Sequence, residues 1–291
     1  MSRTYRFGIF GHPISHSLSP RMHTASFRAL GLQADYTAFD VLPEALAERL
    51  DACRNDGFDG LNLTLPHKTA ALALMTRVDV LAQLAGAINV VRFDADGCTG
   101  FNTDLTGFLA ALLEDCGITP EGKRVLVLGC GGAGRAVALA CAQSGAATIT
   151  LSNRSEDKAQ RLAEDLSRVP DCRSRICTAA GLCATLAASQ DAELVVQCTS
   201  AGLRADDVSP LPPEAFRPGQ VLYDVVTKPV TPTMRIAQAA GVKTANGLGM
   251  LIHQGVHAFK IWTGLDADIH AMRQAVINDA TRFFKVKVEM P

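Results

Sequence analysis

The chain has 291 residues, more than one compact core usually needs, and at about 150 residues per domain this length predicts two domains. Its 48% hydrophobic and 20% charged residues exclude an intrinsically disordered protein. The 28 Lys and Arg residues nearly balance the 29 Asp and Glu residues, so no overall positive charge favours nucleic acid as a partner.

No segment has the pattern of a targeting or membrane sequence. The first residues lack the apolar core and cleavage site of a signal peptide, and no run of about 18 apolar residues occurs. We therefore expect a cytoplasmic protein that does not bind a membrane. Its nine cysteines include no C-x-x-C pair and its histidines no H-E-x-x-H motif, so we expect buried thiols and no metal site.

Short β-rich runs alternate with helical patterns along the chain, which is typical of α/β proteins whose parallel strands are joined by crossover helices. The predicted strands are residues 5–11, 36–41, 60–65, 87–93, 124–129, 148–152, 194–198 and 221–226. The predicted helices are residues 20–30, 43–55, 105–116, 134–144, 156–167, 233–240 and 250–262. The fold class is therefore expected to be α/β.

Two serine hydroxyls precede the first predicted helix. Ser17 and Ser19 stand directly before Pro20, which is suited to the first position of a helix. Hydroxyls at a helix N-terminus suit a carboxylate ligand, and they serve equally well as ordinary helix caps.

The strand at 60–65 presents its polar residues on one face. Strict alternation sends three leucines to one side and Asn62 with Thr64 to the other, and Pro66 ends the strand. Lys68 follows at once, beside a predicted helix over residues 69–75. Its amine suits a general acid or base, although a surface lysine with a buried stem is the commonest outcome for this residue type.

Asp104 stands directly before the helix predicted from residue 105. It is placed as the N-cap, and the residue pattern gives capping and catalysis about equal weight. Turn formers over residues 116–123 then separate this helix from a strongly apolar strand. The chain after residue 247 returns to helix without a new strand. These features predict one domain over residues 1–104 plus 246–291 and a second over residues 105–245.

The apolar strand at 124–129 leads directly into a G-x-G-x-x-G turn formed by Gly129, Gly131 and Gly134, followed by an alanine-rich helix. In this setting the first glycine allows a tight turn, the second lets the backbone approach a pyrophosphate, and the third lets helix and strand pack closely. Gly132 and Ala133 lie within the turn, where backbone N–H groups would hold the anion. The alternative is a glycine-rich turn that binds nothing.

The next strand, at 148–152, ends before Asn153, Arg154 and Ser155, where an NAD enzyme commonly carries an acidic residue. A guanidinium there offers a planar set of donors to a ribose 2′-phosphate, and Lys158 adds positive charge. NADP is therefore the expected cofactor, with a solvated surface arginine as the alternative. We expect an N-terminal α/β substrate domain and a Rossmann-type dinucleotide-binding domain, with a cleft between them.

Taken in order, these residues resemble the shikimate dehydrogenase family along nearly the whole chain. The family motifs S-x-S-P, N-x-T-x-P-x-K, G-A-x-N, N-T-D, the glycine-rich turn, N-R-[ST] and G-L-G-M-L appear here at Ser17, Asn62, Gly86, Asn102, Gly129, Asn153 and Gly247.

The resemblance implies an NADP-dependent oxidoreductase that reduces 3-dehydroshikimate to shikimate, reversibly, in the chorismate pathway. It implies that Ser17 and Ser19 hold the substrate carboxylate and that Lys68 is the catalytic lysine, paired with Asp104. The residues implied to bond the ring hydroxyls and carbonyl are Asn62, Thr64, Asn89, Asp104 and Gln254. Those expected at the cofactor are Gly129, Gly131, Gly132, Ala133, Gly134, Asn153, Arg154, Lys158 and Gly247.

Two departures from the family pattern keep other substrates open. Thr227 stands where the family's Y-D-x-x-Y segment has its second tyrosine, and Val90 replaces the threonine of G-A-x-N-T. A quinate/shikimate dehydrogenase, or one acting on an amino analogue of shikimate, is therefore the alternative. A catalytically silent NADP(H)-binding sensor is a third hypothesis, opposed by the intact Lys68 and Asp104. The expected assembly is a monomer or homodimer.

Overall fold

In a computed structural model, which describes residues 3–204 and 206–284, the chain divides into two compact units. Unit 1 contains Met1–Thr103 and Leu251–Pro291, and unit 2 contains Asp104–Met250. Within the described residues, no helix combines the length and apolar character needed to cross a membrane.

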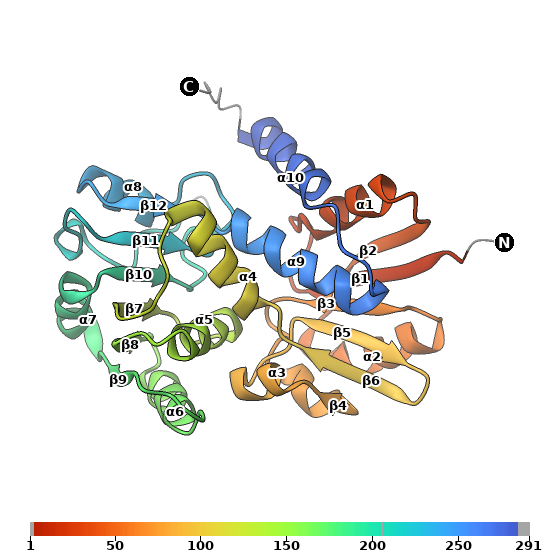
Figure 1. The fold of residues 1–291 in the computed structure, drawn as a ribbon, viewed down its shortest axis with the longest axis horizontal. Helices are drawn as coiled ribbons and strands as arrows, with labels where there is room; N and C mark the ends of the chain where they lie inside the picture. Colours follow the sequence, from red (N-terminus) through yellow and green to blue (C-terminus); the bar gives the residue numbers. More distant parts are fainter. Residues whose placement is uncertain (1–2, 205, 285–291) are drawn as a thin grey trace. The chain divides into compact units, whose positions relative to one another are not determined.

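Unit 1 is built on a six-stranded sheet with the strand order β2-β1-β3-β5-β6-β4 (Figure 1). Its strands are β1 (Tyr5–Gly11), β2 (Ala34–Asp40), β3 (Gly60–Leu63), β4 (Arg77–Val78), β5 (Val90–Asp94) and β6 (Gly97–Phe101). Its helices are α1 (Ser19–Ala29), η1 (Pro43–Ala45), α2 (Leu46–Asn55), η2 (Ala70–Leu74), α3 (Val80–Ala85), most of α9 (Leu248–Thr263) and α10 (Ile269–Phe284). Strands β1, β2 and β3 are parallel, so their carboxyl ends meet at one edge.

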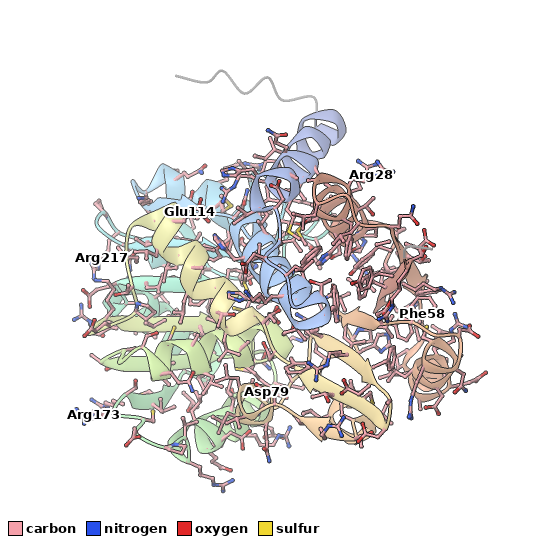
Figure 2. All side chains as sticks on the ribbon, turned by 45° about the vertical axis from the view of Figure 1, so that its right-hand side comes forward. Arg28, Phe58, Asp79, Glu114, Arg173 and Arg217 are labelled. Atoms are coloured by element: carbon pink, nitrogen blue, oxygen red, sulfur yellow. The ribbon has the colours of Figure 1, made fainter. Side chains whose placement is uncertain are left out.

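The parallel pairing expected from the sequence does not extend to every strand of unit 1. Strand β5 runs antiparallel to both β3 and β6. The turn between β5 and β6 comes immediately before Gly97, and an Asp-Gly pair between two β-rich runs is a hairpin signal that the sequence analysis missed. Helix α3 was missed as well, although Asp79, labelled in Figure 2, caps it through a 3.0 Å bond from Leu81 N–H. Gly86 ends this helix in the left-handed conformation.

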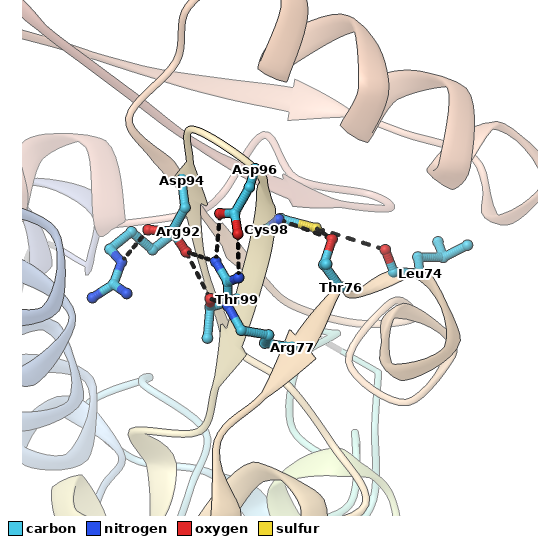
Figure 3. Close-up of polar contacts among 8 residues, drawn as sticks. All are labelled: Leu74, Thr76, Arg77, Arg92, Asp94, Asp96, Cys98 and Thr99. Carbon is cyan, nitrogen blue, oxygen red and sulfur yellow. Dashed lines mark hydrogen bonds and ion pairs between the residues drawn. The ribbon is translucent and has the colours of Figure 1, made fainter.

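Ion pairs attach the two-residue strand β4 to the β5–β6 hairpin (Figure 3). The Arg77 guanidinium donates to Asp96 at 2.8 and 3.0 Å and to Asp94 at 3.0 Å. Thr99 donates to the same Asp94 carboxylate at 2.7 Å. The hydrogen bond from Arg77 holds the pKa of Asp96 below its usual value.

Unit 2 is built on a six-stranded sheet in the order β12-β11-β10-β7-β8-β9, with every pair parallel (Figure 1). Its strands are β7 (Arg124–Leu128), β8 (Thr148–Ser152), β9 (Arg175–Thr178), β10 (Leu194–Gln197), β11 (Val221–Asp224) and β12 (Lys243–Ala245). Its helices are α4 (Asp104–Ala111), η3 (Leu112–Cys116), α5 (Gly132–Gln143), α6 (Glu156–Ser167), α7 (Gly181–Asp191), η4 (Pro213–Ala215), α8 (Pro232–Ala239) and the start of α9. The strand order reverses between β7 and β10, the place where doubly wound sheets bind nucleotides.

Helix α9 is held against the sheet of unit 1 by the Trp262 indole, which packs closely on strand β3. Trp262 Nε1–H donates to the Val91 carbonyl at 3.0 Å, and its ring stacks on Phe7 with 4.7 Å between centroids. Gly60 leaves the space that the indole occupies. A Cβ at this position would overlap Trp262 Nε1 and lie 2.5 Å from the Val91 oxygen.

Substitution Gly60→Ala is therefore expected to lower the free energy of unfolding by about 2 kcal/mol or more, because neither backbone nor indole can yield without losing contacts. Urea unfolding monitored by fluorescence measures the loss. Gly131→Ala is the matched control, since Gly131 has φ −81° and its Cβ would meet no atom within 4 Å. Equal stability of the two variants would contradict this account of the packing.

Candidate active site

Helix α1 begins at Ser19, and its N-cap position holds no polar side chain. The N-cap residue is Leu18, without a side-chain hydrogen bond, and the Ser17 hydroxyl accepts from the Ser19 N–H at 3.3 Å. Ser17 is half-buried, and Ser19 is only 3% exposed. Capping therefore accounts for a contact of the Ser17 hydroxyl but does not account for the Ser19 hydroxyl.

Asn62 lies on β3 between the neighbouring strands β1 and β5, and it is 4% exposed. Its Oδ1 accepts a 2.6 Å hydrogen bond from the Tyr36 hydroxyl of β2. Its Nδ2 donates to the Asn89 carbonyl at 3.1 Å. The amide is therefore held at both ends within the sheet.

A second buried amide, Asn89, joins three segments of unit 1. Its Nδ2 donates to Thr103 Oγ1 at 2.9 Å and to Gln254 Oε1 at 3.2 Å. Its Oδ1 accepts from the Thr103 N–H at 2.8 Å. Gln254, on α9, is anchored in turn by a 2.7 Å bond from its Nε2 to the Leu251 carbonyl. Asn62, Asn89 and Gln254 thus form one connected cluster.

Lys68 and Thr64 follow β3 in a segment tied to this cluster. Leu63 N–H donates to the Asn89 carbonyl at 2.9 Å, and Ile88 N–H donates to the Lys68 carbonyl at 2.7 Å. Thr64 and Lys68 are both half-buried. The helix predicted over residues 69–75 is instead the short 3₁₀ helix η2, because the chain must become extended again at Met75 to enter β4.

His67, between these two residues, is 1% exposed and its Nε2 lies 2.8 Å from the Val41 carbonyl. Burial lowers its pKa, which keeps the ring neutral and fixed to the backbone of the neighbouring segment. The backbone around Lys68 is therefore anchored on both sides.

Asp104 is the first residue of α4 and belongs to unit 2. The sequence had instead predicted Asp104 as the N-cap of a helix starting at residue 105. Asp104 is only 3% exposed. Val90, one of the departures from the family pattern, is fully buried as the first residue of β5. Its replacement of a threonine is thus a change within a packed strand.

The glycine-rich turn follows β7 as predicted, and two of its glycines are required by geometry. Gly129 has φ +95°, a conformation that a larger side chain rarely adopts. A Cβ at Gly134 would overlap the Gly129 carbonyl oxygen. At Gly131, in contrast, a Cβ would meet no atom within 4 Å. The turn is therefore tightly packed at Gly129 and Gly134 and open at Gly131, where a phosphate can approach the backbone.

Helix α5 starts at Gly132, two residues earlier than predicted, so Gly132 and Ala133 provide its first N–H groups. Its first turn contains no acidic residue. Unopposed N–H groups at a helix N-terminus attract anions, so this end of α5 suits a pyrophosphate.

Asn153, at the end of β8, holds the glycine-rich turn in place. Its Oδ1 accepts from the Cys130 N–H at 3.0 Å, and its Nδ2 donates to the Ser155 carbonyl at 2.9 Å. Arg154 and Lys158 extend into solvent beside it. Within residues 3–204 and 206–284, no hydrogen bond or ion pair engages the Arg154 guanidinium. The positive charges are thus available to a ligand.

Gly247 and the segment after β11 complete the carboxyl edge of the unit 2 sheet. A Cβ at Gly247 would overlap the Val225 carbonyl oxygen, so close backbone packing explains this glycine. Asp224 accepts from Thr231 Oγ1 at 2.5 Å and from Val226 N–H at 3.0 Å, while burial raises its pKa to about 6.

Two participants in the unit 1 cluster were missed by the sequence analysis. Tyr36 contacts Asn62, and His23 stacks on Tyr36 at 4.8 Å between ring centroids, with 6° between the ring planes. Neither lies in one of the family motifs, so only the three-dimensional pairing of β2, α1 and β3 reveals them. Across the described residues, no group of three or more His, Cys, Asp or Glu side chains is placed to hold a metal ion.

Family models match both parts of the chain. The shikimate dehydrogenase substrate binding domain matches residues 9–91, and the shikimate 5′-dehydrogenase C-terminal domain matches residues 247–277. The saccharopine dehydrogenase NADP binding domain matches residues 125–206. This last match covers the strand, glycine-rich turn and Arg154 segment described above.

Curated relatives and solved structures extend the similarity over nearly the whole length. The NADP(+) shikimate dehydrogenase of Methanopyrus kandleri is 40% identical, covering 93% of this chain and 94% of the relative. The shikimate 5-dehydrogenase of Thermus thermophilus, solved with NADP(H) and shikimate, is 41% identical with a TM-score of 0.83, covering 94% of this chain and 99% of that one. The quinate dehydrogenase of Corynebacterium glutamicum, solved with NAD, is 31% identical with a TM-score of 0.84, covering 94% and 99%.

Proposed function

The chain belongs to the shikimate dehydrogenase family, and on this basis we propose that it catalyses the reversible, NADP-dependent reduction of 3-dehydroshikimate to shikimate. The observation that carries the proposal is the buried cluster of Asn62, Asn89 and Gln254 beside the Lys68 segment. A polyhydroxylated ring needs several fixed donors and acceptors, and buried amides supply both.

Substrate binding uses the start of α1 together with this cluster. The Ser17 and Ser19 hydroxyls at the start of α1 bind the carboxylate, because hydroxyl and helix N–H groups together stabilise an anion. Asn62, Thr64, Asn89 and Gln254 bind the ring hydroxyls and orient the carbonyl. Several fixed contacts of this kind discriminate strongly against a ring that lacks one hydroxyl, since a buried amide would then lose its partner.

Lys68 and Asp104 are the proposed catalytic residues. When bound, NADPH would supply the hydride that adds to the carbonyl carbon of the ring. The Lys68 ammonium donates a proton to the carbonyl oxygen as negative charge develops there, and in the oxidation direction the neutral amine accepts the proton back. The Asp104 carboxylate accepts a hydrogen bond from the reacting hydroxyl and keeps its oxygen oriented.

The cofactor residues are those at the carboxyl edge of the unit 2 sheet. The N–H groups of Gly131, Gly132 and Ala133 fit a pyrophosphate, and Arg154 with Lys158 fit the 2′-phosphate of NADP. Asn153 acts on the cofactor by holding the turn, as its two hydrogen bonds indicate.

Arg154→Ala is expected to raise the KM for NADP by about 10- to 50-fold and to leave the KM for NAD nearly unchanged, because only NADP carries the phosphate that the guanidinium neutralises. Steady-state kinetics with both cofactors measures the change. Arg175→Ala is the control, since Arg175 is exposed at the amino end of β9. A similar increase for NAD and NADP would argue against a 2′-phosphate contact.

The activity is tested by following nicotinamide absorbance with NADP or NAD and with shikimate or quinate, in all four combinations. Rapid reduction of NADP with shikimate is the expected result. Preference for quinate would show that Thr227 and Val90 have changed the specificity, and tight NADP binding with no turnover would favour a sensor.

We also propose a cytoplasmic location, which the nine free thiols support because that compartment keeps cysteines reduced. The proposed assembly is a monomer or homodimer, which light scattering during size-exclusion chromatography distinguishes.

A further inference from the structure

The hydroxyl of Tyr36 supports one of the proposed substrate-binding residues. It donates to Asn62 Oδ1 at 2.6 Å. A tyrosine hydroxyl has one hydrogen, so that hydrogen is committed to Asn62. The bond joins β2 to β3 across the intervening strand β1.

The hydrogen bond from Tyr36 fixes which atoms of Asn62 a ligand can use. Oδ1 accepts from Tyr36, and one Nδ2 hydrogen is directed to the Asn89 carbonyl. The second Nδ2 hydrogen is then the group that remains to contact a ligand, so Asn62 presents a donor. Without the Tyr36 hydroxyl, the amide gains rotational freedom and can exchange its donor and acceptor ends.

The Tyr36 ring is itself held rigidly. It stacks on His23 with 4.8 Å between ring centroids. The Trp262 ring packs beside both, with its centroid 5.3 Å from that of His23 and 6.3 Å from that of Tyr36. Burial also raises the pKa of Tyr36 well above its usual value, so the hydroxyl stays protonated and remains a donor at every working pH.

We infer that Tyr36 is a positioning residue for the substrate, which holds the Asn62 amide in the orientation that donates to a ring hydroxyl. The inference rests on the proposed function, because it assigns Asn62 to the substrate. A purely structural tyrosine would need the ring alone, since stacking on His23 does not involve the hydroxyl. The two roles therefore differ in what removal of the single oxygen atom does.

Tyr36→Phe removes that oxygen and keeps the stacked ring. We expect the KM for shikimate to rise about tenfold, which corresponds to the loss of one hydrogen bond, with kcat changed by less than about twofold and the KM for NADP unchanged. Tyr5→Phe is the matched control. Tyr5 lies on β1, and its hydroxyl makes no hydrogen bond within residues 3–204 and 206–284.

A double-mutant cycle with Asn62→Ala separates positioning from general damage. If Tyr36 acts through Asn62, adding Tyr36→Phe to Asn62→Ala leaves the KM for shikimate at the value of Asn62→Ala alone. A tenfold further increase in the double variant would overturn the inference, and so would an unchanged KM in Tyr36→Phe. Thermal unfolding and NADP affinity of each variant show that it is folded.

The wild-type protein distinguishes this inference from the proposed function. Turnover of shikimate by the wild type together with an unaffected Tyr36→Phe variant refutes the role of Tyr36 alone. A wild type that neither binds nor oxidises shikimate, measured by calorimetry and absorbance, refutes the proposed function and the inference with it.

Discussion

Replacement of Lys68 by methionine is expected to lower kcat for shikimate oxidation by about 10³-fold, the usual contribution of a positioned general acid or base. Methionine keeps the length and the apolar stem of lysine but offers no proton. The backbone at this position is fixed by the bond from Ile88 N–H and by the buried His67 ring, so the loss should reflect chemistry and not a displaced segment.

Stopped-flow or steady-state absorbance measures this loss, and the affinity for NADP should stay within about twofold because the cofactor residues belong to unit 2. Lys260→Met is the control. Lys260 is a lysine of the same unit whose ammonium lies 2.5 Å from Asp266 Oδ1 on an exposed surface. Full turnover in Lys68→Met would remove Lys68 from the mechanism while leaving the family assignment intact.

The sequence predicted β7, β8 and α6 of unit 2 where the structure has them, but it missed β9, α7 and β12. The predicted elements follow one pattern, in which an apolar strand is followed by a helix. Strands β9 and β12 are short and partly exposed, so they lack the apolar run that this pattern needs. Unit 1 departs from that pattern after β3. There the chain forms a hairpin and a two-residue strand that depends on Arg77 ion pairs, and so short a strand has no periodicity to detect.

In the candidate site, too, the sequence indicated some residues and missed others. Motif residues such as Asn62, Asn89 and Gln254 were named from the sequence, and the structure joins them through hydrogen bonds. Tyr36 escaped notice because its role depends on the parallel pairing of both β2 and β3 with β1, which places it across β1 from Asn62, 26 residues away in the chain. Sequence alone assigned Asn153 to the cofactor, and its hydrogen bonds add that it holds the glycine-rich turn.

A buried histidine is expected to make unit 1 sensitive to acid. His23 is fully buried, and within the described part of the chain neither ring nitrogen makes a hydrogen bond of normal geometry. Burial, which outweighs the opposing effect of Asn62, lowers its pKa from 6.5 to about 3. The groups that face the ring are Tyr36 and Trp262, neither of which carries a charge to stabilise an imidazolium.

The lowered pKa of His23 makes the folded protein less stable in acid. His23 is neutral in the folded protein and has its ordinary pKa when unfolded, so its contribution to stability is complete above pH 6.5 and is lost progressively as the pH falls toward 3. One pKa unit corresponds to about 1.4 kcal/mol, so between pH 7 and pH 4.5 His23 alone should remove about 2–3 kcal/mol. Asp224 in unit 2, whose pKa is raised to about 6, acts in the opposite direction.

His23→Phe isolates this contribution, because phenylalanine keeps the stack on Tyr36 and cannot be protonated. Urea unfolding at pH 7 and pH 4.5, monitored by the single tryptophan Trp262, should show that the variant loses about 2–3 kcal/mol less than the wild type over this interval. Asp224 is present in both proteins, so its effect cancels in the comparison. His270→Phe, at an exposed position on α10, should lose as much as the wild type. If His23→Phe and the wild type lost the same stability, the acid sensitivity of unit 1 would have to arise from carboxylates such as Asp94 and Asp96, whose pKa values are lowered in the folded state.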